Sequence, residues 1–281
     1  EAQNLNQGKR VLFISSYSYG WDTVQTQIEG IKAGVDENTT IDYEFMDTKR
    51  FRTDEWLNMF HDMLKYHLEN TDPYDVVIVG DDAALQFAME YREELFPEIP
   101  VVFEGVNDEE YAMKAAENPL VTGIIEKLSV EKNIDMALKV NPTADKVVAI
   151  LDDSVTADAE RKNFYSAEAE YPELEFSEIN SSELTTAQLQ QAISKVDDKT
   201  ILIYIVMSKD GSGKQYTSDQ ALCMIVDYAK VPVYRMVEAG IGDGLLGGNV
   251  VSMYKSGEIA AQMAMDIANG TDSAEINVVK D

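Results

Sequence analysis

Hydroxyl and aromatic side chains crowd the segment that follows the first apolar run of the chain. That run, Val11 to Ser15, has the composition of a strand, and Tyr17, Tyr19 and Trp21 follow it closely. A short exposed turn cannot bury three large rings, so the segment favours stacking against a small molecule or an opposing lobe. We therefore predict that these three rings stack on a ligand and that Ser15 hydrogen-bonds to it.

Polar residues also follow four later apolar runs. These segments are Gly80 to Asp82, Glu104 to Asn107, Asp152 to Ser154, and Met207 to Asp210. Ligands of open parallel sheets bind beyond the carboxyl ends of the strands, which makes these residues candidate binding groups. The polar side chains predicted to contact the ligand are Asp81, Asn107, Asp153 and Ser208. Lys209 or Arg235 is the predicted partner of a ligand carboxylate. Helix capping and turn formation are the competing interpretation of each residue taken alone.

The sequence lacks the motifs of common enzymes. Residues 211–214 read Gly-Ser-Gly-Lys, but Gln215 stands where a phosphate-binding loop needs Ser or Thr. No Gly-x-Ser-x-Gly segment occurs, and neither histidine follows a strand, so the usual hydrolase arrangements are not supported. The rival enzyme hypothesis would depend on Lys209 with Asp152 or Asp153 in a cleft. We predict no catalytic residue, no enzymatic activity and no cofactor.

The net charge, the two histidines and the single cysteine limit the kinds of partner that the chain could bind. The 281 residues include 51 acidic and 23 basic side chains, giving a formal charge of −28, which would repel a nucleic acid. His61 and His67 are six residues apart in a helical pattern, so they face different directions and predict no shared metal ion. Cys223 lies in an apolar run and is expected to be buried and inert. The predicted partner is a neutral or zwitterionic small molecule with an apolar or ring-shaped portion, most simply an amino acid.

Strand-like and helix-like runs alternate along the chain in two similar sets. The runs of the first set are 11–15, 24–35, 41–45, 56–68, 76–79, 83–91 and 101–103. After Asn118-Pro119 the strand-like runs are 147–151, 174–179, 201–206 and 231–234, and the helix-like runs are 157–170, 185–196, 218–228 and 256–269. Such alternation is typical of a parallel sheet with helices on both faces. The sequence therefore predicts an α/β fold of two doubly wound parallel-sheet lobes joined by a hinge, with the ligand in the cleft between them.

Two glycine-containing segments are the predicted crossings between the lobes. They lie at residues 123–125 and 247–250, where glycine would permit the dihedral changes of a hinge. The N-terminal lobe is accordingly predicted to contain residues 1–125 and 251–270. The C-terminal lobe is predicted to contain residues 126–250 and 271–281.

Several segments, in their order and spacing, resemble a known family. They are residues 11–17, 74–85, 100–107, 121–126, 152–154, 208–213 and 244–248. Together they resemble type I periplasmic-binding-protein-like domains. These include the extracytoplasmic sensor domains of bacterial histidine kinases and diguanylate cyclases, and the substrate-binding proteins of ABC transporters, some of which take aromatic amino acids. The resemblance implies closure of two lobes on a small solute.

Two functions fit this resemblance. The leading hypothesis is the extracytoplasmic sensing domain of a membrane-anchored signalling protein, such as a histidine kinase. The alternative is the substrate-binding protein of an ABC importer, with the permease as partner. No apolar run approaches the roughly 20 residues that span a bilayer, and we expect any anchor to lie outside this sequence.

Overall fold

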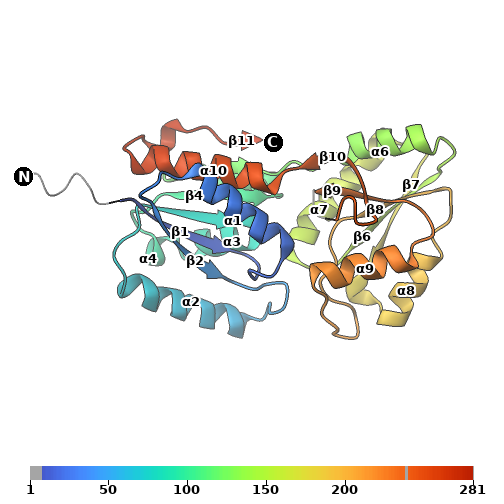
Figure 1. Ribbon diagram of the computed structural model, residues 1–281, viewed down its shortest axis with the longest axis horizontal. Helices are drawn as coiled ribbons and strands as arrows, with labels where there is room; N and C mark the ends of the chain where they lie inside the picture. Colours follow the sequence, from blue (N-terminus) through green and yellow to red (C-terminus); the bar gives the residue numbers. More distant parts are fainter. Residues whose placement is uncertain (1–7, 238–239, 281) are drawn as a thin grey trace, which may run out of the picture. The chain divides into compact units, whose positions relative to one another are not determined.

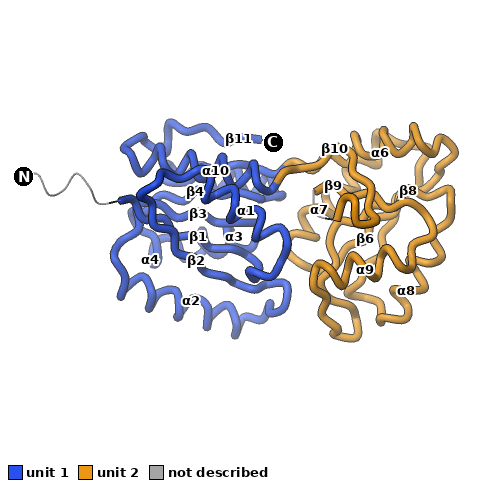
Figure 2. Tube along the Cα trace, in the orientation of Figure 1, with its two compact units in different colours: residues 1–126, 253–281 blue, residues 127–252 orange. Residues whose placement is uncertain are grey.

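The chain divides into two units, each built on its own parallel sheet. A computed structural model describes residues 8–237 and 240–280; unit 1 contains residues 1–126 and 253–281, and unit 2 contains residues 127–252 (Figure 2). Every strand pairing within the two sheets is parallel. The predicted class, an α/β fold with two doubly wound parallel sheets, is confirmed.

Sheet A of unit 1 has the strand order β11-β5-β4-β3-β1-β2. Its strands are β1 (Arg10–Ser15), β2 (Thr40–Phe45), β3 (Val76–Gly80), β4 (Val101–Val106), β5 (Val121–Ile125) and β11 (Val279–Lys280). One face packs on α2 (Asp54–Glu69), α3 (Asp81–Glu90), α4 (Arg92–Leu95) and α5 (Glu109–Ala115). The other face is covered by α1 (Asp22–Gly34) and α10 (Met253–Ala268), which lie side by side (Figure 1). The middle strands β3 and β4 are fully buried, as is typical of parallel strands covered by helices on both faces.

Sheet B of unit 2 has the order β10-β9-β8-β6-β7. Its strands are β6 (Lys146–Leu151), β7 (Glu175–Asn180), β8 (Thr200–Tyr204), β9 (Val233–Val237) and β10 (Leu246–Val251). The helices α8 (Thr186–Ser194) and α9 (Ser218–Tyr228) bury Leu189 and Ile225 in one core with Leu202 of β8. The remaining helices are α6 (Val130–Val140) and α7 (Val155–Ser166), and the short 3₁₀ helices of the chain are η1 (Ala167–Glu170), η2 (Ser181–Glu183) and η3 (Ser273–Glu275).

Side-chain caps explain where several helices begin. Thr217 and Gln220 form a reciprocal capping box at the start of α9, and Thr185 and Gln188 form a second one at α8. Ser154 caps α7 by accepting the Ala157 N–H. The first two of these helix starts therefore follow from local sequence alone.

The crossings between the units differ from the predicted ones. Gly123 lies inside β5 and Gly248 inside β10, while the units meet in the sequence at residues 126/127 and 252/253. Gly123 serves close packing, because a Cβ there would lie 2.2 Å from the Phe103 carbonyl oxygen. Gly248 is similarly crowded by the Asn133 side chain. Both glycines therefore lie inside strands, a few residues before the crossings, and their hinge role stays a prediction.

The C-terminal segment also belongs to a different unit than predicted. Residues 271–281 were expected in the C-terminal lobe, but β11 pairs with β5 at the edge of sheet A. Thr122 additionally donates its hydroxyl to the Ile276 carbonyl oxygen over 2.8 Å. This segment therefore completes unit 1.

The environment of Cys223 was also predicted wrongly. Its neighbours in the sequence are apolar, but the side chain lies on the exposed face of α9, whose buried residues are Ala221, Met224 and Ile225. At helical spacing those three residues share one face and turn Cys223 outward.

Candidate ligand-binding site

Two serines fix the backbone at the end of β1. Ser16 donates its hydroxyl to the Gly80 carbonyl oxygen over 2.7 Å and accepts the Ala84 N–H over 2.8 Å. Ser15 is fully buried, and its Oγ accepts the Tyr17 N–H over 3.1 Å. Both hydroxyls therefore shape the loop after β1, and the predicted contact between Ser15 and a ligand remains a prediction.

The three aromatic residues of this loop do not share one environment. Tyr17 and Trp21 are buried with their ring centroids 6.1 Å apart, whereas Tyr19 is 58% exposed and meets Phe45 edge-on. The three rings are therefore not all buried, as expected, but Tyr19 is the one that stays exposed, and the stacking of these rings on a ligand stays a prediction. Trp21 is the residue that precedes α1, and its ring lies beside that of Tyr17.

Lys49 is a site residue that the sequence analysis missed. Its Nζ lies 4.3 Å from the centre of the Tyr17 ring and 5.0 Å from that of Trp21, and its side chain is buried. Cations are attracted to aromatic faces at this range. Lys49 follows β2, so the rule applied to the other strands, that binding groups follow strand ends, would have found it.

The loop after β2 holds Lys49 in place. Thr48 donates its N–H and its hydroxyl to the Ser16 carbonyl oxygen over 2.9 and 2.8 Å. Asp47 has the left-handed φ of 56° and pairs with Arg50. These contacts tie the loop to the end of β1 and present Lys49 beside the aromatic rings.

Three buried acids lie at the carboxyl edge of sheet A. Asp81, the first residue of α3, has a φ of 69° and accepts the Gln27 Nε2–H over 3.1 Å. Asp82 accepts the N–H groups of Asn107 and Asp108 over 3.1 and 3.0 Å. Glu104 on β4 is fully buried. These contacts replace the predicted helix capping, since neither Asp81 nor Asp82 caps α3.

Burial controls the protonation of these acids. It raises the pKa of Asp81 to about 7, with the Gln27 hydrogen bond and the Lys49 charge opposing the rise. It raises the pKa of Asp82 to about 6 against the two backbone N–H donors. Burial, and then the charge of Asp81, raise the pKa of Glu104 well above its ordinary value. This edge of unit 1 therefore carries carboxyl groups that are partly protonated at neutral pH.

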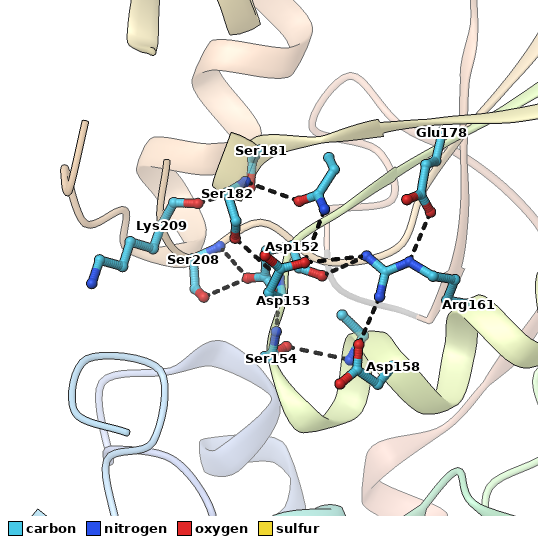
Figure 3. A network of polar contacts seen from close by, with 12 residues as sticks. Asp152, Asp153, Ser154, Asp158, Arg161, Glu178, Ser181, Ser182, Ser208 and Lys209 are labelled. Atoms are coloured by element: carbon cyan, nitrogen blue, oxygen red, sulfur yellow. Dashed lines mark hydrogen bonds and ion pairs between the residues drawn. The ribbon is translucent and has the colours of Figure 1, made fainter. Parts of the chain in front are cut away.

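In unit 2, Asp152 organises the carboxyl edge of sheet B (Figure 3). Its Oδ2 accepts the Ser208 N–H over 2.9 Å and the Ser208 hydroxyl over 2.5 Å. Its Oδ1 accepts the Ser154 N–H over 2.9 Å. Asp152 is fully buried, so these charge-assisted bonds set the position of the Ser208 hydroxyl.

Asp153 is held in a neighbouring polar network (Figure 3). Asn180 donates to its Oδ1 over 2.8 Å, and its own N–H donates to the Ser182 hydroxyl over 3.0 Å. Arg161 lies 3.6 Å from the same carboxylate and bonds Glu178 over 2.9 Å. The predicted binding role of Asp153 therefore competes with a structural one.

Lys209 and Asp210 lie in the loop after β8. The Lys209 ammonium points away from the Asp152 network, while its carbonyl oxygen accepts the Ser181 hydroxyl over 2.8 Å (Figure 3). Burial alone would raise the pKa of Asp210, but hydrogen bonds from Ser212, Thr186 and Tyr216 outweigh it and lower the pKa to about 2. Asp210 thus fixes the loop that displays Ser208 and Lys209.

Arg235 lies inside β9 and is buried. Its guanidinium sits 4.1 Å from the centre of the Tyr204 ring and donates to the carbonyl oxygens of Tyr204 and Ile205. Its predicted pairing with a ligand carboxylate would add to these contacts. Asn107, the remaining predicted contact, is buried at the end of β4, and its Nδ2 has no hydrogen-bond partner among the described residues.

Neither a metal centre nor a membrane span is found in the described part of the chain. Over residues 8–237 and 240–280, no group of three or more His, Cys, Asp or Glu side chains could hold a metal ion. His61 contacts Asp62 and Glu94, whereas His67 contacts Glu44. Within the same residues, no helix is long and apolar enough to cross a bilayer.

Two units, each built on a parallel sheet flanked by helices, are the architecture of the type I periplasmic-binding-protein fold. The family model for ABC transporter substrate-binding proteins matches residues 21–281. The chain belongs to this family. No curated protein is significantly similar to it in sequence.

Solved structures share the fold at low sequence identity. The ABC domain from Streptococcus pneumonia in complex with L-Trp has a TM-score of 0.71 and 15% identity, over 98% of this chain and 89% of that one. A ligand-free substrate-binding protein with adhesive properties from Clostridium difficile has a TM-score of 0.62 and 17% identity, covering 97% and 89%. A carbohydrate transporter from Acidothermus cellulolyticus in complex with myo-inositol has a TM-score of 0.62 and 15% identity, covering 97% and 92%. The family match favours the transporter alternative over the sensor hypothesis, which gains no support from it.

Proposed function

We propose that this chain is the extracytoplasmic substrate-binding protein of an ABC importer and that its ligand is a zwitterionic amino acid with a ring-bearing side chain. The match to the family over residues 21–281 is the observation that carries the importer role. The permease of that importer is the proposed membrane partner. Anchoring of the full-length protein at the membrane, by a lipid or a peptide segment, stays a prediction.

The ligand class is supported by opposite charges beside aromatic rings in unit 1. Lys49 lies against Tyr17 and Trp21, and its charge acts on the Asp81 carboxyl. A zwitterion offers a carboxylate to the lysine and an ammonium to the aspartate, which lowers the cost of desolvating each charge. The L-Trp bound by the Streptococcus pneumonia protein supports the same class.

A thermal-shift comparison of three related compounds tests this proposal. L-tryptophan should raise the melting temperature, because a ligand held at 100 times its dissociation constant adds about 2.7 kcal/mol of stability. Tryptamine, which lacks the carboxylate, and indole-3-propionate, which lacks the ammonium, should each give a much smaller shift. Myo-inositol serves as the uncharged comparison, and a shift with it alone would contradict the amino-acid assignment.

Two lysine variants sharpen the assignment. Lys49→Met should abolish the preference for L-tryptophan over tryptamine, since the predicted carboxylate partner is gone. Lys114→Met removes an exposed lysine of α5 and should leave that preference unchanged. If both variants showed the same preference for L-tryptophan over tryptamine, Lys49 would not be the partner of the ligand carboxylate.

A further inference from the structure

The acids of unit 1 meet at a place where other polar atoms also lack partners. Both carboxyl oxygens of Glu104 and the Oε1 of Gln27 are buried and, among the described residues, accept no hydrogen bond of good geometry. The Gln27 side chain lies near enough to Glu104 to lower its pKa, but burial and the charge of Asp81 outweigh this effect. Gln27 uses its Nε2 on Asp81. Since native proteins satisfy most buried polar groups, these orphaned oxygens indicate that something else completes the cluster.

Glycines bring these groups close together. A Cβ on Gly80 would lie 3.1 Å from Glu104 Oε1, and a Cβ on Gly105 would lie 2.9 Å from Gln27 Nε2 and 3.2 Å from Asp81 Oδ1. Gly105 has a φ of 65°, which other residues rarely adopt. The two carboxyl groups therefore share one space lined by backbone at the carboxyl edge of β3 and β4.

The surroundings supply too little positive charge for two buried carboxylates. Gln27 from α1 and Met253 at the start of α10 are neutral, and Gln27 Nε2 lies 3.9 Å from Met253 Sδ. The charged side chains that act on Asp81 are Lys49 and Asp82. One lysine against three buried acids, Asp81, Asp82 and Glu104, would leave uncompensated charge if all three were ionised, which is costly inside a protein.

We propose that Asp81 and Glu104 share one buried proton in unit 1, and that a ligand placing its ammonium group beside Asp81 releases that proton. This proposal rests on the proposed function for its ligand class only. The O–H bond of the carboxyl breaks, the proton passes to solvent, and the ammonium replaces its charge, so no electrons are transferred. Binding near neutral pH is then coupled to proton release, as for any group whose protonation differs between two states.

The proton can be tested without a ligand. In the protein carrying ¹³C-labelled Asp and Glu carboxyl groups, the resonance lost in Glu104→Gln identifies Glu104. At pH 6, which is well above the ordinary pKa of glutamate, this resonance should still have the chemical shift of a protonated carboxyl group. In Asp81→Asn, which tolerates the left-handed φ, the same resonance should titrate at lower pH because the neighbouring charge is gone. An ionised Glu104 at pH 6, or one unaffected by Asp81→Asn, would overturn the shared proton.

Calorimetry with L-tryptophan tests the exchange. At pH 7, binding heats in phosphate and Tris should differ by the ionisation heat of a fraction of one proton per ligand, released rather than taken up. The release should vanish in Asp81→Asn and persist in Glu55→Gln, which changes an exposed acid of α2. Binding with equal heats in both buffers would overturn the exchange and leave the proposed function intact. A protonated Glu104 with no binding of L-tryptophan would support the proton pair and count against the amino-acid assignment.

Discussion

Ser208 donates both its backbone N–H and its hydroxyl to one oxygen of Asp152, over 2.9 and 2.5 Å. The carboxylate comes from the end of β6 and the serine from the loop after β8, so the pair joins the ends of neighbouring strands of sheet B. Because Asp152 is fully buried, Ser208 has a fixed orientation before any ligand arrives.

Asp152→Asn should destabilise unit 2 by about 2–4 kcal/mol, because an amide replaces one acceptor oxygen by an N–H donor that faces other donors. Chemical denaturation monitored by circular dichroism measures the loss. Asp158→Asn is the matched control, since that side chain is 66% exposed and its ion pair with Arg161 should contribute less than about 1 kcal/mol. Similar losses in the two variants would show that the buried carboxylate has no special structural role.

The contribution of Asp210 to the free energy of unfolding should depend on pH in the acid range. Its pKa is about 2 in the folded state, below its ordinary value, so its stabilisation is present above about pH 4 and is lost as the pH falls through 2. The contribution at neutral pH is about 2 kcal/mol. The free-energy difference between wild type and Asp210→Asn should therefore shrink between pH 4 and pH 2. Asp227→Asn, at an exposed position of α9, should show no such trend; a constant difference for Asp210→Asn would contradict the assignment.

The packing of α1 on α10 reverses the usual effect of a helical glycine. Replacing glycine by alanine normally stabilises a helix by about 1 kcal/mol. At Gly30, however, a Cβ would lie 2.0 Å from the Tyr254 carbonyl oxygen. Gly30→Ala should therefore lower the free energy of unfolding by about 1–3 kcal/mol. Gly20→Ala, where nothing lies within 4 Å, is the control. A stabilised Gly30→Ala protein would contradict the close helix contact.

Substitutions of Tyr19 and Trp21 should have different effects on ligand affinity and on the stability of the fold. Tyr19→Ala removes an exposed ring and should change the stability by less than about 0.5 kcal/mol. If the ring stacks on the ligand, the affinity falls about tenfold. Trp21→Ala removes a buried ring and should cost about 3 kcal/mol of stability. Calorimetric binding and thermal denaturation of both variants measure the two effects. A destabilised Tyr19→Ala or a fully stable Trp21→Ala would reverse these assignments.

Local patterns predict the frame of the molecule well and its site only in part. The strand-like run 76–79 lies in the buried strand β3, and the helix-like run 218–228 is the helix α9, as predicted. The two-residue strand β11 carries too short a pattern to be recognised, and only its pairing with β5 defines it. Helix α10 begins at Met253, three residues before the predicted start, and Met253 contacts Gln27 from a distant part of the chain.

The site residues that escaped prediction depend on long-range contacts. Lys49 is placed by a loop in which Thr48 donates to the carbonyl oxygen of Ser16, 32 residues before Thr48 in the chain. Glu104 reads as one acid among many, and only its burial against Gly80 makes it unusual. The order of residues after the strands indicates which edge carries the site, whereas burial and charge at each residue require the folded chain.

Identification of the bound molecule tests the central claim most directly. The purified protein is equilibrated with a mixture of the twenty amino acids and several sugars, separated from free solutes and denatured, and the released molecules are identified by mass spectrometry. The proposed function predicts about one equivalent of a single, chemically unchanged amino acid per chain, with strong loss of retention in Lys49→Met. Retention of a sugar alone, of a chemically altered product or of no solute would contradict it.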